Sequence, residues 1–187
     1  GMLSQKPKIL GGGLSSLVMV DGNVTKARSI NRGVSADKIR ITGHLDHDKL
    51  HSGFSKRDSL RQQHCEQYGF LLDRPILIVS TPQLLEEGTL DWESHLAAQR
   101  QIFGALNDTP CNTLVSLHPS TARKNYEFLE EEFSVVISVD RLGSILPVGD
   151  AFVVPRGSSV QLWGLLCEIP TIAIDLGWYN HPTYYDS

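Results

Sequence analysis

Cysteine is scarce in this sequence, and its three cysteines form no recognisable pattern. Cys65, Cys111 and Cys167 are widely spaced, which argues against both a disulfide framework and a zinc motif. This usage is typical of a reducing compartment, so we expect a cytoplasmic protein.

Long hydrophobic runs and an excess of one charge are also missing. No apolar stretch approaches the roughly 18 residues needed to cross a bilayer, and the N-terminus lacks the regions of a signal peptide. The formal net charge of −4 gives no electrostatic reason to expect nucleic acid or an anionic membrane as partner. A chain of 187 residues, 41% of them hydrophobic, is long enough for one sizeable core and a fragment of a second domain.

The apolar runs that are present are short and bounded by turn residues, which is typical of buried strands. Between them, apolar residues recur every three or four positions in 94–106 and 122–133, and 160–167 is almost wholly apolar, so these segments are predicted to be helices. Alternating strands and helices predict an α/β fold, specifically a three-layer Rossmann-like sandwich with a mainly parallel sheet. The expected strands are 17–20, 76–80, 113–117, 135–139, 151–154 and 171–174.

The first part of the chain has a different pattern. After the strand at 17–20 we expect a helix at 25–31, a short strand at 38–43 and a mostly polar helix at 55–70. We interpret residues 1–33 as a linker or the remnant of a preceding domain, and residues 34–187 as the Rossmann-like domain.

The loops that follow parallel strands meet at one edge of the sheet, where ligands bind. In "PRGSSV", Gly157, Ser158 and Ser159 precede a predicted helix, which places free N–H groups, hydroxyls and the positive end of the helix dipole together. These features favour a phosphate, and Arg156 could add a charge-assisted bond. The alternative is that a serine only caps the helix.

Two more loops belong to the same predicted edge. "LHPST" places His118 at a strand end, where it could donate to a phosphate or a sugar hydroxyl, although a purely structural histidine is the alternative. "STPQLLEEG" contains Thr81, which we include among the predicted phosphate-binding residues.

"GHLDHDKLH" invites a metal interpretation through His44, Asp46, His47, Asp48 and His51. A catalytic zinc site needs three oriented ligands and outer-shell partners. The segment follows a strand and a glycine, so we expect a solvated loop or an interdomain contact there and no metal.

Four stretches, taken in order, form a recognisable set. They are "RGVSADKIRITGHLDHDKL" at 32–50, "ILIVSTPQ" at 76–83, "LVSLHPST" at 114–121 and "ILPVGDAFVVPRGSSVQLWGLLCEIPTIAID" at 145–175. This set resembles the C-terminal half of GT-B fold nucleotide-sugar enzymes, in particular UDP-N-acetylglucosamine 2-epimerases, CDP-glycerol glycerophosphotransferase-like proteins and capsular polysaccharide glycosyltransferases.

This resemblance implies a nucleotide-diphosphate-sugar-binding domain of a glycosyltransferase acting in surface polysaccharide biosynthesis. The alternatives are an epimerase-like protein and a non-catalytic binding or interaction module. The implied ligand is a UDP- or CDP-linked sugar acting as substrate, with no further cofactor. The implied diphosphate-binding residues are Thr81, Arg156, Gly157, Ser158 and Ser159, with His118 as the catalytic residue and Gln161, Asp140 and Arg141 beside the ribose or base.

The resemblance also implies that a preceding Rossmann-like half, or a partner chain, completes the catalytic cleft, so we expect this chain alone to be inactive. Gln161 and its neighbours stand where many family members carry a ribose-binding glutamate, which leaves the nucleotide unspecified. The aromatic tail, with Trp178, Tyr179, Tyr184 and Tyr185, suggests self-association into a homo-oligomer.

Overall fold

The computed structural model describes residues 15–175. Contacts within the chain divide it into two compact units, the first extending through Asp48 and the second starting at Lys49. This division lies later along the chain than the boundary expected after residue 33. The aromatic tail lies outside the described residues.

The first unit is a small βαβ element whose two strands pair in parallel, with Val18 opposite Ile39. Its core consists of Val20, Val34 and Ile39, with Val18 packed against them. The elements are β1 (Val18–Val20), α1 (Asn23–Asn31), the 3₁₀ turn η1 (Ala36–Lys38) and β2 (Ile39–Ile41).

The expectation of a loop around "GHLDHDKLH" was wrong, because Leu45–Phe54 forms a helix, α2. Its first turn carries Asp46 and Asp48, where negative charge favours helix formation, and its last turn carries His51. Leu50 is fully buried and Phe54, one turn later, packs against the same core, so an apolar spacing of four stabilises the helix.

The second unit confirms the predicted α/β class. Its five strands are all parallel and lie in the order β5-β4-β3-β6-β7. The strands are β3 (Ile76–Ser80), β4 (Asn112–Ser116), β5 (Val135–Ile137), β6 (Ala151–Pro155) and β7 (Thr171–Ile174). The helices are α3 (Arg57–Tyr68), α4 (Trp92–Leu106), α5 (Phe128–Glu132), α6 (Leu142–Ile145) and α7 (Gln161–Leu166), with 3₁₀ turns η2 (Arg123–Asn125) and η3 (Leu146–Val148).

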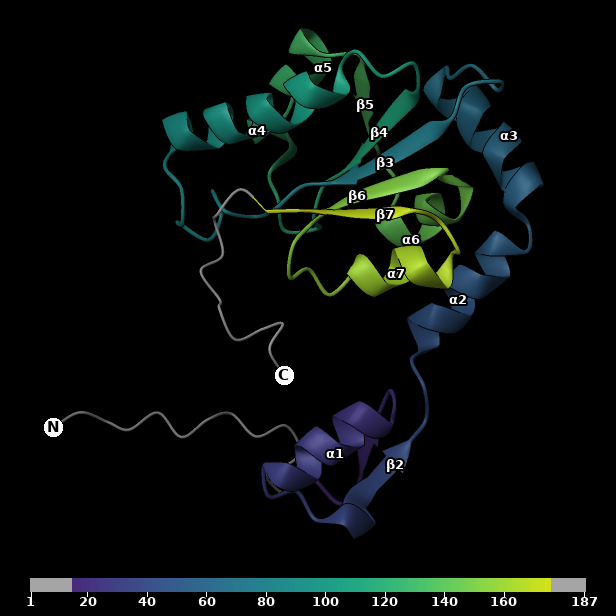
Figure 1. Cartoon of the computed structure of the whole chain (residues 1–187), viewed down its shortest axis with the longest axis vertical. Helices are drawn as coiled ribbons and strands as arrows, with labels where there is room; N and C mark the ends of the chain where they lie inside the picture. The colour runs from purple at the N-terminus through teal and green to yellow at the C-terminus, as the bar shows by residue number, and fades with distance from the viewer. Residues whose placement is uncertain (1–14, 176–187) are drawn as a thin grey trace, which may run out of the picture. The chain divides into compact units, whose positions relative to one another are not determined.

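Helices cover both faces of this sheet, giving three layers (Figure 1). Successive residues of β3 point to opposite faces. Ile76 and Ile78 join the core under α3, α6 and α7, while Leu77 and Val79 join the core under α4 and α5. Both faces of the central strand are therefore buried, which explains why its sequence is a continuous apolar run instead of an alternating one.

The segment 122–133 is less regular than predicted. Instead of one helix it forms η2 and then α5, separated at Tyr126, whose ring is fully buried. The three cysteines are free, in agreement with their spacing. Within residues 15–175, no helix is long and apolar enough to cross a membrane.

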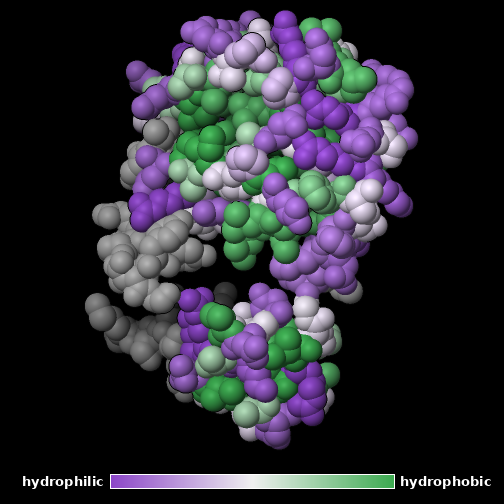
Figure 2. Space-filling model, turned by 45° about the vertical axis from the view of Figure 1, so that its right-hand side comes forward, coloured by the Kyte–Doolittle hydropathy of each residue, from purple (hydrophilic) through white to green (hydrophobic). Residues whose placement is uncertain are grey.

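Hydrophobic side chains also gather on parts of the surface (Figure 2). On α7 and the edge strand β7, several large apolar side chains are exposed. These are Leu162, Leu165, Leu166 and Ile172.

Candidate functional site

The order of the strands defines where a ligand is expected in the second unit. β3 and β6 are neighbours at the centre of the sheet, but the chain leaves β3 for α4 on one face and leaves β6 for α7 on the other. In open parallel sheets, ligands bind at the carboxyl ends of the strands beside such a switch of direction. The loops containing Thr81 and Gly157 begin at this point.

The turn after β6 is built around Gly157. Its φ of 82° lies in the left-handed region, which favours glycine. The N–H of Ser158 donates to the carbonyl oxygen of Pro155 over 3.1 Å, which closes the turn. A Cβ added at Gly157 would meet no atom within 4 Å, so the space beside the turn is open. The turn lies at the surface, with Ser158 partly exposed and Ser159 exposed.

The serines of this turn do not cap the helix that follows. Val160 occupies the N-cap position of α7, and no side chain caps it. In the described part of the chain, neither the hydroxyls of Ser158 and Ser159 nor the N–H of Ser159 makes a hydrogen bond. With only six residues, α7 has a small dipole. The donors left without a partner among residues 15–175 are therefore the two hydroxyls and the N–H of Ser159.

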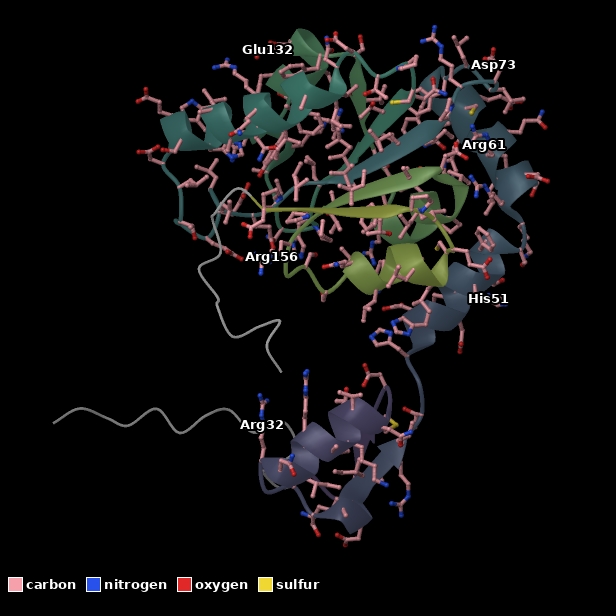
Figure 3. The ribbon with its side chains drawn as sticks, viewed as in Figure 1. Arg32, His51, Arg61, Asp73, Glu132 and Arg156 are labelled. Atoms are coloured by element: carbon pink, nitrogen blue, oxygen red, sulfur yellow. The ribbon has the colours of Figure 1, made fainter. Side chains whose placement is uncertain are left out.

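Arg156 has a partner inside the protein. The Arg156 guanidinium forms an ion pair with Asp175, which follows β7. The backbone N–H of Arg156 donates to the carbonyl oxygen of Ile174 over 2.8 Å. Figure 3 shows Arg156 where β6 and β7 end, and Arg61 at the other edge of the sheet. The Arg156 charge thus lies at the carboxyl ends of the strands, as predicted, but the Asp175 carboxylate partly compensates it.

His118 follows β4 and is linked through Ser120, in its own loop, to the loop after β3. The N–H of Ser120 donates to its Nδ1 over 3.2 Å, and the Ser120 hydroxyl lies 2.9 Å from the same nitrogen. Gln83, from the loop after β3, donates through Nε2 to the Ser120 hydroxyl. His118 is exposed, so its other ring nitrogen is accessible to a ligand.

Thr81 lies at the same edge but below the surface, with 5% of its side chain exposed. Tyr126 is packed beside this loop, and its hydroxyl donates to the carbonyl oxygen of Pro82 over 3.2 Å. Burial, together with the nearby Glu86 carboxylate, raises the pKa of Tyr126 above its ordinary value. The buried Thr81 and Tyr126 thus hold the loop after β3 against the core.

Of the three residues predicted to lie beside the ribose or base, Asp140 is hydrogen-bonded within the protein, while Arg141 and Gln161 are accessible. The Asp140 carboxylate accepts hydrogen bonds from Tyr68, over 2.8 Å, and from Gln67, over 2.9 Å, both on α3. Arg141 is exposed immediately before α6, and Gln161 is partly exposed at the start of α7.

α6 and α7 are neighbours on one face of the sheet. A Cβ added at Gly143 would lie 3.7 Å from the Trp163 ring. Arg141, just before α6, and Gln161, at the start of α7, are therefore positioned by adjoining helices, whereas the Asp140 carboxylate is already hydrogen-bonded within the protein.

Sequence reasoning missed Gln83, Ser120, Tyr68 and Tyr126. The spacing of two between His118 and Ser120 is typical of local side-chain to backbone bonds and could have predicted that contact. No local pattern connects Tyr68 with Asp140 or Gln83 with Ser120, because these pairs depend on the packing of distant segments.

The histidine-rich segment forms no metal site in the structure. The rings of His44 and His47 stack with their centroids 4.6 Å apart. Across residues 15–175, no group of three or more His, Cys, Asp or Glu side chains is placed to hold a metal ion.

The sequence matches no family model and no curated protein. Among solved structures, the wall teichoic acid polymerase TagF is 13% identical with a TM-score of 0.58, and the match covers 89% of this chain and 41% of TagF. UDP-GlcNAc 2-epimerase from Neisseria meningitidis, bound to UDP-GlcNAc, is 15% identical with a TM-score of 0.59, over 84% of this chain and 44% of that one.

A glycosyltransferase from Rickettsia africae is 14% identical with a TM-score of 0.51, over 88% of this chain and 46% of that one. The chain thus spans less than half the length of each of these structures. At these identities the likeness concerns the fold alone. The chain has the Rossmann-like fold found in one half of GT-B nucleotide-sugar enzymes, which confirms the resemblance seen in the sequence.

Proposed function

We propose that the chain is the nucleotide-diphosphate-sugar-binding half of a GT-B type glycosyltransferase that acts in surface polysaccharide biosynthesis. The observation that carries this proposal is the turn from Gly157 to Ser159. Within residues 15–175, the hydroxyls of Ser158 and Ser159 and the N–H of Ser159 make no hydrogen bond, and they lie at the switch point where open α/β sheets bind ligands. Unpaired donors of this kind suit the oxygens of a diphosphate.

In this proposal, His118 and the Gly157 turn bind the diphosphate from two different loops. Negative charge grows on the departing nucleotide diphosphate as the sugar is transferred. Donors that are already in position stabilise that charge without reorganisation. Gln161 begins α7 and Arg141 immediately precedes the adjoining α6, and both are assigned to the ribose or base. Thr81 is buried, so its assigned part becomes support of the loop instead of direct contact.

The same proposal assigns the acceptor site to a second Rossmann-like half, supplied by the same protein or by a partner chain. A two-domain cleft accelerates transfer by excluding water and bringing two reactants together. We therefore expect this chain to bind nucleotide sugar without turnover. Transfer or hydrolysis of the sugar by this chain alone would contradict the assignment.

Thermal unfolding in the presence of ligand tests the binding. A ligand that binds only the folded state raises its stability by RT ln(1 + [L]/Kd). We expect UDP-GlcNAc, UDP, CDP-glycerol or CDP at millimolar concentration to raise the Tm, and ribose at the same concentration to leave it unchanged. No shift with any nucleotide would favour an interaction module that retains only the fold.

The turn is tested by changing Ser158 and Ser159 to alanine together. Lost hydrogen bonds to a charged group should weaken nucleotide binding by roughly 1–3 kcal/mol while the Tm of the free protein changes little. Ser134→Ala is the matched control, because Ser134 is exposed and precedes β5, at the opposite edge of the sheet. Equal affinity in the double variant and the control would remove the turn from the site.

An epimerase-like half is the second candidate, and the likeness to an epimerase bound to UDP-GlcNAc favours it. In that case the same donors anchor UDP, and acids of the other half move a proton on the sugar. The choice of nucleotide separates the two candidates. Stabilisation by UDP and UDP-GlcNAc but not by CDP would favour the epimerase-like form.

A further inference from the structure

The hydrogen bonds around His118 determine which of its ring nitrogens carries the proton. The backbone N–H of Ser120 points to Nδ1 at 3.2 Å. A backbone N–H can only donate, so Nδ1 must be the unprotonated acceptor. The neutral ring then carries its proton on Nε2, which makes no hydrogen bond to any residue in 15–175.

The same logic gives a direction to the rest of the network. Because Nδ1 has no proton, the Ser120 hydroxyl 2.9 Å away must donate to it. The hydroxyl oxygen is then left to accept, and the Gln83 amide donates to it. The donors of Gln83 and Ser120 therefore each meet an acceptor, and the Nε2–H of His118 is the donor left over. The chain joins the loop after β3 to the loop after β4.

We infer that Ser120 and Gln83 are positioning residues that hold His118 as the Nε2–H tautomer. In this form His118 offers a fixed donor to an anionic oxygen and cannot act through Nε2 as a general base. The identity of the anion, a nucleotide diphosphate, rests on the proposed function. The tautomer itself depends on these three side chains together with the backbone N–H of Ser120, and it is measurable without any ligand.

This network distinguishes His118 from a histidine whose ring nitrogens make no fixed hydrogen bonds. A ring without this network would exchange between the two tautomers, and its nitrogen facing the ligand would be an acceptor part of the time. Fixing the neutral ring as Nε2–H keeps a donor in place on the side that faces the ligand.

The sharpest variant is Gln83→Glu, which keeps the size of the side chain but replaces a donor with an acceptor. The Ser120 hydroxyl should then donate to the new carboxylate at position 83 instead of to Nδ1, so that the hydrogen bond between positions 83 and 120 changes direction. Ser120→Ala removes the link and keeps the backbone N–H. The control is Gln101→Glu, which makes the same charge change at an exposed position on α4.

Ring nitrogen NMR of histidine-labelled full chain at about pH 8 reads the tautomer, with His118→Gln identifying the signals. We expect Nδ1 of wild type and Gln101→Glu to give an unprotonated nitrogen signal. Gln83→Glu and Ser120→Ala should both show more of the Nδ1–H form. A wild-type ring that already samples both tautomers, or a tautomer ratio unchanged in both variants, would overturn the inference.

Calorimetric binding of UDP and CDP provides the second measurement. Both positioning variants should weaken the nucleotide that binds by roughly 3- to 10-fold, the equivalent of one ordinary hydrogen bond, while Gln101→Glu should not. Unchanged affinity despite an altered tautomer would overturn the positioning role. If neither nucleotide binds wild type, the proposed function fails, and the NMR result alone decides whether the network holds the tautomer.

Discussion

The hydroxyl of Tyr126 donates a hydrogen bond to the carbonyl oxygen of Pro82 over 3.2 Å and so joins the segment after β4 to the loop after β3. Tyr126 is fully buried, and its ring meets His95 edge-on with the centroids 4.8 Å apart. Together with the contact between Gln83 and Ser120, this bond connects the two loops twice. The edge of the sheet that we assign to ligand binding is therefore braced before any ligand arrives.

Tyr126→Phe should remove this bond and keep the packing of the ring. We expect a loss of about 1 kcal/mol in the free energy of unfolding, measured by urea denaturation, because one buried carbonyl loses its donor. Tyr126→Leu removes the ring as well and should cost more. If the phenylalanine variant were as unstable as the leucine variant, the hydrogen bond would be the dominant contribution and our division of the energy would be wrong.

Gly164→Ala should damage the packing of α7 on the sheet. The added Cβ would lie 2.0 Å from Thr171 Oγ1 and 3.0 Å from the Phe152 ring, so something must move. Overpacking of this kind costs about 1–3 kcal/mol, which thermal unfolding would detect.

Gly104→Ala is the matched control for Gly164→Ala, since a Cβ at this exposed position on α4 meets nothing within 4 Å. It should stabilise the helix by up to about 1 kcal/mol. Adding Thr171→Ala to the Gly164 variant should recover part of the loss. Equal effects of the two glycine substitutions would contradict the packing argument.

Asp150→Ala should weaken the attachment of α3 to the sheet. The Asp150 carboxylate accepts from Arg61 and from the backbone N–H of Ile76, each over 2.7 Å, and pairs with Arg57. Burial by itself would raise the pKa of this carboxyl, but the bond from Ile76 and the two arginines hold it below its usual value. We expect a loss of about 1–3 kcal/mol at pH 7.

The pH dependence of the Asp150 effect follows from the direction of that pKa. A carboxyl with a lowered pKa in the folded state contributes stability above its unfolded pKa of about 3.8 and loses it as the pH falls through the folded value. The difference between wild type and Asp150→Ala should therefore narrow below about pH 4. Asp73→Ala, an exposed change of the same charge, should show neither effect.

His95 should make stability fall on mild acidification. His95 is only 1% exposed, and burial lowers its pKa against the opposing effects of a backbone hydrogen bond to Asn125 and of the Glu86 charge. The folded state therefore keeps the ring neutral, while the unfolded chain binds a proton below about pH 6.5. Stability should decline as the pH is lowered from about 7 to 5.

His95→Leu removes this titration and should give a flatter profile over the same range, measured by urea denaturation at each pH. Gln101→Leu, which replaces an exposed side chain without a titratable group on the same helix, should leave the slope of the wild type unchanged. Parallel profiles for wild type and His95→Leu would show that burial does not hold this ring neutral.

The strands of the second unit could be predicted because their sequences carry the signal locally. "ILIVS" and "AFVV" are short, apolar on both faces and bounded by turn residues, and they form β3 and β6 as expected. The segment of α2 was predicted to be a loop because it follows a strand and a glycine, whereas the packing of Leu50 and Phe54 against the core stabilises a helix there. The break at Tyr126 was not predictable, since it depends on a ring buried under another loop.

The sequence by itself determined the fold class, the parallel sheet and the edge at which the Gly157 turn and His118 lie. These follow from hydrophobic periodicity and turn chemistry, which act between residues close along the chain. Only the tertiary structure decided that Arg156 pairs with Asp175, that α3 binds Asp140, that Ser158 and Ser159 leave α7 uncapped, and that Gln83 reaches Ser120. Such contacts join segments far apart in the chain, and they form only after the sheet and helices have packed and brought those side chains within hydrogen-bonding distance.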